Sequence, residues 1–228
     1  ASIRIGLRLS KDETIVRMPF EVRHMGSKYP IFSFDFTGAK RGVLPASYDY
    51  LRLEGRMQYR LNLPPIGYSQ LMLEGGKIFG KVPYLLLKLH EGNGTYFYDR
   101  YAFSCMNFYE FSSDAWISFF YEHHFNGFLL GRVPLLKKLN WREVFVFKGV
   151  YGTLSARNDG SLPNTKAVML FPVGMSSVEH PYLETGFGIE NIFRLLRVDC
   201  IWRLTHHRAV PGLSIPTFTV NFSLNLKF

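Results

Sequence analysis

The charged and hydroxyl side chains of this chain are spaced for ion pairing and not for catalysis. Arg197 and Asp199 lie two residues apart in a segment of alternating polarity, so on a strand both would share one face and could pair. Neither Ser104 nor Ser112–Ser113 lies in the glycine-flanked turn that presents a nucleophilic serine. We therefore expect a structural charge network and no enzyme activity.

Two histidine pairs, His123–His124 and His206–His207, could suggest a zinc site. Adjacent residues on a strand point to opposite faces, so neither pair can chelate an ion as a unit. No cysteine or carboxylate lies beside them at a ligand-like spacing. Cys105 and Cys200 are far apart and form no metal or redox motif, so we expect both to be free. We predict no metal and no other cofactor.

The net charge of +9 does not indicate a nucleic-acid-binding surface, because the basic residues are scattered along strands and turns. Arginine and lysine at every second position of a strand fit a polar lumen better. Gly92-Asn93-Gly94 is a turn signal and not a phosphate loop, because no helix follows it. We expect no nucleic acid among the partners.

The elements that carry these residues are long strands with period two. Residues 217–228, T-F-T-V-N-F-S-L-N-L-K-F, alternate polar and apolar side chains without a break. A strand of this kind has one apolar and one polar face, and its length suits the ~9–11 residues that a tilted strand needs to cross a bilayer. Taken alone, this strand would also fit the edge of a soluble β-sandwich.

Similar segments recur along the chain, and we count about ten strands, nearly all joined as a meander. Pro19 weakens the second strand, because proline removes a ladder hydrogen bond. In the strand 48–62, charged residues occupy four positions of one face, which would be costly in a closed soluble core but tolerable in a wide, hydrated lumen. The expected strands are approximately 3–9, 13–24, 32–37, 48–62, 66–79, 110–125, 141–156, 182–193, 195–205 and 217–228.

The connections between these strands alternate in length. With the C-terminal end placed on the inner side of a membrane, the inner turns are short except for 126–140. The outer connections are long, and they include 38–45, 80–109, 157–180 and 206–215. Short inner turns and long outer loops are typical of transmembrane barrels. The sequence therefore predicts an all-β fold, a transmembrane antiparallel meander β-barrel that forms a single domain over residues 1–228.

The C-terminal strands resemble the end of the barrel in BamA-like outer-membrane proteins. That superfamily has a glycine-alternating strand, a short turn, a strand that opens L-R-x-D, and a closing strand. The matching residues here are Gly186, Gly188, Leu196, Arg197 and Asp199. By this resemblance, Phe228 at the end of the closing strand would be the C-terminal assembly signal.

The segment 80–101, G-K-V-P-Y-L-L-L-K-L-H-E-G-N-G-T-Y-F-Y-D-R-Y, resembles the sixth surface loop of the same superfamily. In that family an Arg-Gly-aromatic motif on the loop folds back into the lumen. The counterpart here is Asp99-Arg100-Tyr101, with tyrosine where the family has glycine. The resemblance implies that the loop 80–109 folds toward the lumen.

Inside such a lumen, the planar guanidinium of Arg100 could pair with carboxylates of neighbouring strands and hold the loop. An exposed loop arginine is the alternative. The expected lumen charge network contains the candidate partners of Arg100 together with the Arg197 pair, namely Asp114, Glu122, Glu184, Arg197 and Asp199.

The strand count agrees with this assignment. If the last strand is the sixteenth of a barrel, the loop 80–109 joins the eleventh to the twelfth, where the superfamily has its sixth surface loop. The chain would then hold the last ten strands of a sixteen-stranded barrel and be the C-terminal portion of a longer protein. More narrowly, the segments F-Y-E-F-S-S-D and P-Y-L-E-T-G-F-G-I-E-N-I-F resemble an uncharacterised Bacteroidetes-type barrel family that follows a carboxypeptidase-regulatory-like domain.

These resemblances imply a non-enzymatic protein in the outer membrane of a Gram-negative bacterium. It would assemble, insert or translocate other envelope components, or be a barrel subunit of a complex that does. Its partners would be the lipid bilayer and other envelope proteins or the rest of its own barrel. Two alternatives remain open, a passive pore with a cationic lumen and a soluble β-rich binding protein.

Overall fold

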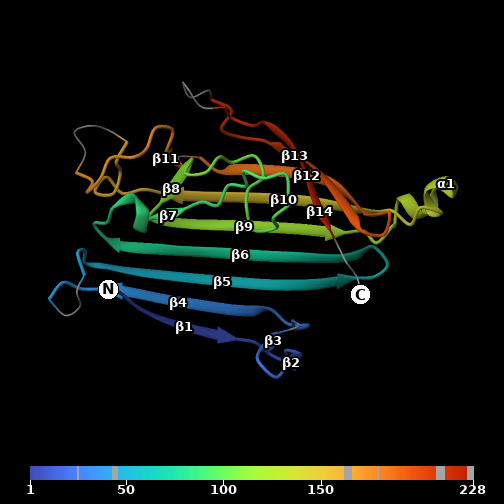
Figure 1. Ribbon diagram of the computed structural model, residues 1–228, viewed down its shortest axis with the longest axis horizontal. Helices are drawn as coiled ribbons and strands as arrows, with labels where there is room; N and C mark the ends of the chain where they lie inside the picture. The colour runs from blue at the N-terminus through green and yellow to red at the C-terminus, as the bar shows by residue number, and fades with distance from the viewer. Residues whose placement is uncertain (25, 43–45, 162–165, 179, 209–213, 225–228) are drawn as a thin grey trace.

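The computed structural model describes residues 1–24, 26–42, 46–161, 166–178, 180–208 and 214–224. Its main element is one antiparallel sheet of nine strands, in the order β1-β4-β5-β6-β9-β10-β12-β13-β14 (Figure 1). The protein is therefore all-β and built on an antiparallel meander. The strands of this sheet are β1 (Ile3–Leu9), β4 (Ile31–Ala39), β5 (Tyr50–Leu63), β6 (Gly67–Gly80), β9 (Ala115–His124), β10 (Arg142–Thr153), β12 (Tyr182–Ile192), β13 (Leu196–Arg203) and β14 (Phe218–Leu224).

The expected second strand, 13–24, does not join this sheet. Its residues form a separate hairpin of β2 (Ile15–Arg17) and β3 (Val22–His24), while β1 pairs directly with β4. Pro19 lies in the turn of the hairpin, where Met18 N–H donates to the Glu21 carbonyl at 2.8 Å. Proline has no N–H to donate to a ladder, so the chain turns here and does not continue as a strand. The prediction of about ten sheet strands was wrong by this one.

The connections contain short elements that period-two alternation did not reveal. β7 (Lys88–Leu89), β8 (Phe111–Ser113) and β11 (Ser176–Ser177) form a small sheet of their own, so the expected strand 110–125 is divided between β8 and β9. The helical pieces are a single turn each. They are η1 (Tyr84–Leu86), η2 (Leu130–Arg132) and α1 (Pro134–Lys137). Within the described residues, no helix is long and apolar enough to cross a membrane.

The two faces of the nine-stranded sheet differ in polarity. We call the face that contacts residues 81–110 the inner face, and the opposite one the outer face. Because side chains alternate along each strand, the register places aromatic and aliphatic residues on one face and charged residues on the other. Outer-face side chains that are exposed include Phe32, Phe34, Phe36, Ile117, Phe187, Trp202, Phe218 and Phe222. Inner-face side chains that are buried include Glu74, Glu122, Lys148, Glu184, Arg197, Asp199 and Arg203.

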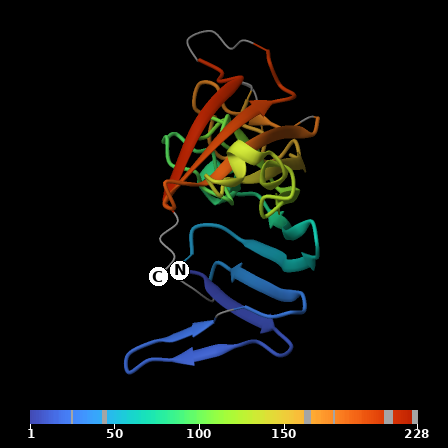
Figure 2. The ribbon, with the colours of Figure 1, turned by 90° about the vertical axis from the view of Figure 1, so that its right-hand side faces the viewer.

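The main core lies between the inner face and residues 81–110, which we call the docked loop. Figure 2 shows the sheet curving around this segment, drawn in green. Phe103 of the loop is 1% exposed and packs against Phe120 of β9 and Tyr182 of β12, with ring centroids 5.1 and 5.3 Å away. Met106 completes the loop's contribution to the same cluster. The loop therefore supplies the apolar surface that the inner face of the sheet needs for its core.

The described strands do not close into a cylinder, because β1 and β14 are the two edges of the sheet. The edge of β14 that faces away from β13 is nevertheless paired with the docked loop. Phe222 donates its N–H to the Tyr96 carbonyl at 2.7 Å and accepts from Tyr98 N–H at 2.8 Å, in a parallel bridge with the docked loop. The side chains of Phe218, Phe222 and Leu224 are 46%, 39% and 64% exposed, so no second sheet covers them in the described residues. Phe228 lies outside the described residues.

Candidate functional site

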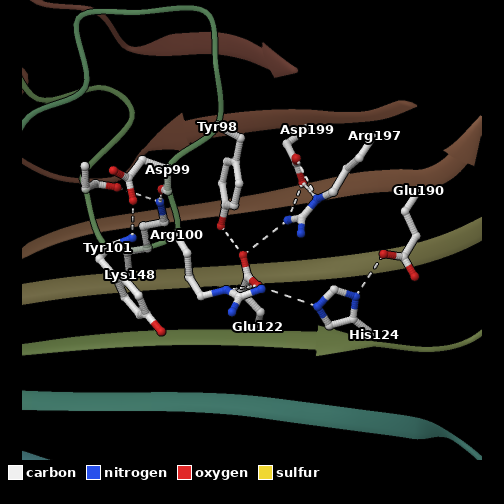
Figure 3. A network of polar contacts seen from close by, with 11 residues as sticks. Tyr98, Asp99, Arg100, Tyr101, Glu122, His124, Lys148, Glu190, Arg197 and Asp199 are labelled. Carbon is white, nitrogen blue, oxygen red and sulfur yellow. Dashed lines mark hydrogen bonds and ion pairs between the residues drawn. The ribbon is translucent and has the colours of Figure 1, made fainter. Parts of the chain in front are cut away.

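The docked loop is fixed to the inner face by charged side chains from four neighbouring strands, β9, β10, β12 and β13. Figure 3 shows the tip of the loop above β9 and β10, with its polar side chains pointing toward the sheet. Both side chains and main-chain groups of the loop take part.

Glu122 of β9 is the centre of the network, and its side chain is 1% exposed. Its carboxylate accepts from Arg100 Nε of the loop tip at 2.7 Å and from Arg197 of β13 at 3.3 Å. The Tyr98 hydroxyl also donates to it, and His124 Nε2 lies 3.5 Å away. Burying a lone carboxylate would cost several kcal/mol, so this set of donors is what makes the position tolerable. Two of these donors belong to the loop, which couples loop docking to the charge of Glu122.

Arg197 and Asp199 pair on the inner face of β13. The guanidinium makes two parallel bonds to the carboxylate, each 2.8 Å long, and its planar face lies 4.4 Å from the Tyr98 ring. A two-bond pairing of this kind fixes the orientation of the arginine. Arg197 is thereby aimed at Glu122, which lies on a strand three positions away in the sheet.

The glycine-alternating strand makes room for this pair. Gly188 of β12 lies opposite Asp199 in the register, and a Cβ added at Gly188 would overlap the Asp199 carboxylate. Gly186 lies opposite Ile201, and a Cβ there would crowd the β13 backbone. A side chain at either position of β12 would collide with atoms of β13, so both positions require glycine.

Lys148 of β10 holds the loop tip through its backbone. The ammonium donates to the carbonyl of Asp99 at 2.7 Å and to that of Ala102 at 2.6 Å, and it lies 4.5 Å from the Tyr98 ring. The side chain is 1% exposed, so water does not compete for these carbonyls. Because the two acceptors flank Arg100 in the chain, Lys148 sets the position from which Arg100 reaches Glu122.

Glu184 of β12 binds the next part of the loop. Its two carboxylate oxygens accept from the backbone N–H groups of Ser104 at 2.8 Å and Cys105 at 2.7 Å, and the Tyr182 hydroxyl donates to it at 2.6 Å. Glu184 is fully buried, and its three donors satisfy it within the protein. Glu184 does not contact Arg100, although the sequence had suggested it as a candidate partner.

The C-terminal end of the loop is fixed by Arg203 of β13. Its guanidinium pairs with Glu110 at 2.6 Å and donates to the Cys105 carbonyl at 3.1 Å. Cys105 is buried there, and burial together with the Glu184 charge raises the pKa of its thiol to about 12. Cys105 and Cys200 are both free, as expected, and the protonated Cys105 thiol is a poor nucleophile.

The remaining predicted site residues lie apart from this network or at its margin. The Asp99 carboxylate accepts from Tyr101 N–H at 2.8 Å and so turns the loop tip, and the Tyr101 ring packs edge-on against Phe120. Asp114 contacts neither Arg100 nor the other predicted members. It accepts from Ser155 N–H at 3.0 Å, and it binds the connection that follows β10.

His123 and His124 of β9 lie on opposite faces, as alternation requires, whereas His206–His207 follows the end of β13 and is not on a strand. His124 Nδ1 contacts Glu190 on the inner face at 3.1 Å, whereas His123 Nδ1 contacts Ser69 at 2.8 Å from the outer side of β9. His206 contacts the His180 carbonyl. Across the part of the chain that the structure describes, no cluster of three or more possible ligands could hold a metal ion.

His90 and Ser113 form a buried pair that no sequence motif indicates, with their Nε2 and Oγ atoms 2.9 Å apart. Burial lowers the pKa of His90 to about 3, so this imidazole is neutral and a weak base. Its Nδ1 atom has no hydrogen-bond partner among the described residues, and no carboxylate orients the ring. The pair therefore lacks the third group that activates a serine nucleophile.

Lys148 is the main residue of the network that sequence reasoning missed. The strand 141–156 has the poorest alternation of the expected strands, so its pattern does not indicate which individual side chains face the loop. A signal was present, because Lys148 interrupts the inner-face row formed by Val144, Val146 and Val150. A lysine in an otherwise apolar row of a buried strand needs acceptors, and here the loop supplies them.

As a whole, the arrangement can hold an extended loop across one face of a sheet and keep that face closed to solvent. A family model described as the C-terminal domain of a family of unknown function, DUF5686, matches residues 1–156. No curated protein matches the chain.

Proposed function

The chain belongs to the DUF5686 family, and we propose that its sheet is the wall of a β-barrel in the outer membrane of a Gram-negative bacterium, which assembles, inserts or translocates other envelope components. Further strands joined to the edge of β1 would complete the barrel, and the edge of β14 would lie at its seam. The docked loop would close the lumen along the described wall. The protein would act without catalysing a covalent reaction, alone or as a barrel subunit of a larger complex.

The observation that carries the membrane part of this proposal is the polarity of the two sheet faces. Trp202 and Phe187 are exposed on the outer face, while Arg197 and Asp199 are buried on the inner one. A soluble sheet would bury its apolar face and hydrate its charged face. A barrel wall does the opposite, because lipid covers the outer face and the lumen holds the charges.

A passive pore with a cationic lumen is the weaker alternative for this wall. The inner-face cations Lys148, Arg197 and Arg203 are all bonded to acceptors within the protein. The docked loop also covers part of the inner face, where it contacts β9, β10, β12 and β13. These features support a closed wall whose charges hold a loop, and they leave few free cations to select permeating anions.

The assembly role is supported by the paired edge of β14. Strand edges bind extended segments through main-chain hydrogen bonds, which makes such binding tolerant of the incoming sequence. Tyr96–Tyr98 already binds this edge in that way, although it belongs to a loop and not to a sheet strand. An edge of this kind could bind a strand of a client protein if the loop segment moved away.

Quenching of tryptophan fluorescence by brominated lipid tests the membrane part. The protein would be reconstituted in vesicles of phosphatidylcholine with or without bromine on the acyl chains. Trp202 on the outer face should be quenched, so Trp202→Phe should remove most of the quenching. Trp116, which is 5% exposed on the inner face, provides the control, because Trp116→Phe should retain it. Equal quenching of all three proteins, or none in any, would refute a lipid-facing outer surface.

A reversible crosslink tests the assembly part. Phe97 and Phe222 are bridge partners, so cysteines at the two positions should form a disulfide that locks the loop on the β14 edge. If the edge must be free for function, cells carrying the oxidised double variant should lose outer-membrane proteins, and a reductant should restore them. Each single variant, Phe97→Cys or Phe222→Cys, is the control. An unchanged outer-membrane protein profile in the fully oxidised double variant would exclude a role for this edge in assembly.

A further inference from the structure

A cavity of about 660 Å³ lies beside the docked loop on the inner face, and the proposed barrel function does not use it. It is bounded by β5, β6 and β9, by the loop tip and by the connection that precedes β4. Its lining includes the side chains of Arg60, Gln70, Gln58, Lys28 and Tyr101.

The sheet register places the polar groups of the cavity side by side. Arg60 of β5 lies opposite Gln70 of β6, and Gln70 lies opposite Glu122 of β9. Directly opposed side chains on neighbouring strands are about 4.5–5.5 Å apart at their Cβ atoms, so one small ligand could contact both Arg60 and Gln70. Gln58 lies two residues before Arg60 on β5, at the adjacent inner-face position.

The guanidinium of Arg60 is oriented before any ligand arrives. It lies over the Tyr68 ring, 4.1 Å from the centroid, and Tyr68 in turn is stacked on His124 with an interplanar angle of 11°. Stacking engages the flat face of the guanidinium and leaves its N–H donors at the edge. Arg60 forms no ion pair with any described carboxylate, so those donors are available.

The acidic groups of the cavity do not neutralise Arg60. Glu122 is engaged by Arg100 and Arg197, and Asp12 lies in the connection between β1 and β2. Lys28 likewise has no described carboxylate partner. The cavity thus combines a pre-oriented guanidinium with a neighbouring amide and a second cation.

We propose that this cavity binds a ligand through a carboxylate or phosphate group, held by the guanidinium edge of Arg60 and the amide of Gln70. An oxyanion accepts two parallel hydrogen bonds from a guanidinium, which is the interaction that an arginine with a fixed plane favours. The oxyanion could belong to a free solute of the lumen or to a phospholipid headgroup. The chemistry of the site is the same for both sources.

Two binding measurements on the full protein in neutral detergent distinguish the sources. In the first, inorganic phosphate is titrated at constant ionic strength, with chloride as the balancing anion, and binding is measured from the phosphorus NMR line width. In the second, native mass spectrometry counts the phosphatidylglycerol molecules that the protein retains relative to phosphatidylcholine. Arg60→Gln should weaken binding about tenfold in one of the two measurements, since it removes a charge-assisted pair of hydrogen bonds.

Two further variants make the result specific. Arg60→Lys keeps the charge but loses the planar fork, so its binding should lie between that of the wild type and that of Arg60→Gln. Arg17→Gln removes a charge that is likewise exposed, on β2 and outside the cavity, and should leave binding unchanged. Equal effects of Arg17→Gln and Arg60→Gln would show a nonspecific charge effect and overturn the proposal. So would a wild-type protein that binds neither phosphate nor phosphatidylglycerol above the level of Arg60→Gln.

Discussion

Replacing Lys148 by methionine should release the tip of the docked loop. The two hydrogen bonds from its ammonium to the carbonyls of Asp99 and Ala102 contribute about 1.5–3 kcal/mol each, because the donor is charged. The contact with the Tyr98 ring adds about 1 kcal/mol. Methionine fills a similar volume and recovers part of the desolvation cost of the buried charge. The net loss of docking free energy should be about 2–4 kcal/mol, which corresponds to a 30- to 1,000-fold larger undocked population by the relation of about 1.4 kcal/mol per factor of ten.

Trypsin measures this population, because the Arg100–Tyr101 bond lies at the loop tip. The Arg100 side chain is bonded to Glu122 in the docked state, so cleavage there requires the tip to leave the inner face. When docking and undocking are fast relative to cleavage, the cleavage rate follows the undocked population. Lys148→Met should therefore be cut after Arg100 at least about 30 times faster than the wild type. Lys138→Met, an exposed change beyond α1, is the matched control. An unchanged cleavage rate at Arg100 in Lys148→Met would refute the claim that this lysine fixes the tip.

Three other predictions concern the same network and the loop beside it. Glu122→Gln and Arg100→Gln should each lower resistance to urea, and the double variant should lose about 1–3 kcal/mol less than the sum of the two, a coupling that a double-mutant cycle in urea unfolding measures. Burial lowers the pKa of His90 to about 3, so this residue stays neutral in the docked loop. In the undocked loop, His90 binds a proton once the pH falls below its ordinary pKa of about 6.5. The free energy of docking should therefore be largest above about pH 6.5 and should fall by at most about 1.4 kcal/mol for each pH unit below it. His90→Gln should reduce this pH dependence, as measured by hydrogen exchange of the loop corrected for intrinsic exchange rates. Gly188→Ala should destabilise the protein by about 1–3 kcal/mol in urea unfolding, because the new methyl group displaces the Asp199 carboxylate, whereas Gly131→Ala, which meets open space, should have little effect.

The regular part of the fold could be predicted from alternation alone. Strict period two placed β4, β5, β6, β12, β13 and β14 within a few residues of their ends, because each strand has one apolar face and one polar face. It failed at residues 13–24, where the apolar residues of a two-stranded hairpin mimic a continuous strand. Pro19 indicated the turn of this hairpin, because proline has no N–H to donate to a strand ladder.

The candidate site was predictable only where charged side chains meet each other. Arg197 and Asp199 share a face by spacing, and Arg100 needed a carboxylate, which the structure supplies as Glu122. The bonds of Lys148 and Glu184 could not be predicted, because their partners are backbone carbonyls and N–H groups. Main-chain groups are the same at every residue, so no residue type in the loop points to these contacts.

That use of main-chain groups has a consequence for how the loop can vary among relatives. A lysine that binds two carbonyls, and a glutamate that binds two N–H groups, recognise the path of the chain and not its side chains. Substitutions at an exposed loop position such as Tyr96 could therefore accumulate without loosening the tip, provided that the backbone keeps its course, whereas the buried Ala102 and Ser104 must stay small. In an alignment of the family, Lys148 and Glu184 should thus vary less than the exposed residues of the loop they hold. The sheet would then keep the backbone path of the loop constant while the exposed side chains of the loop change.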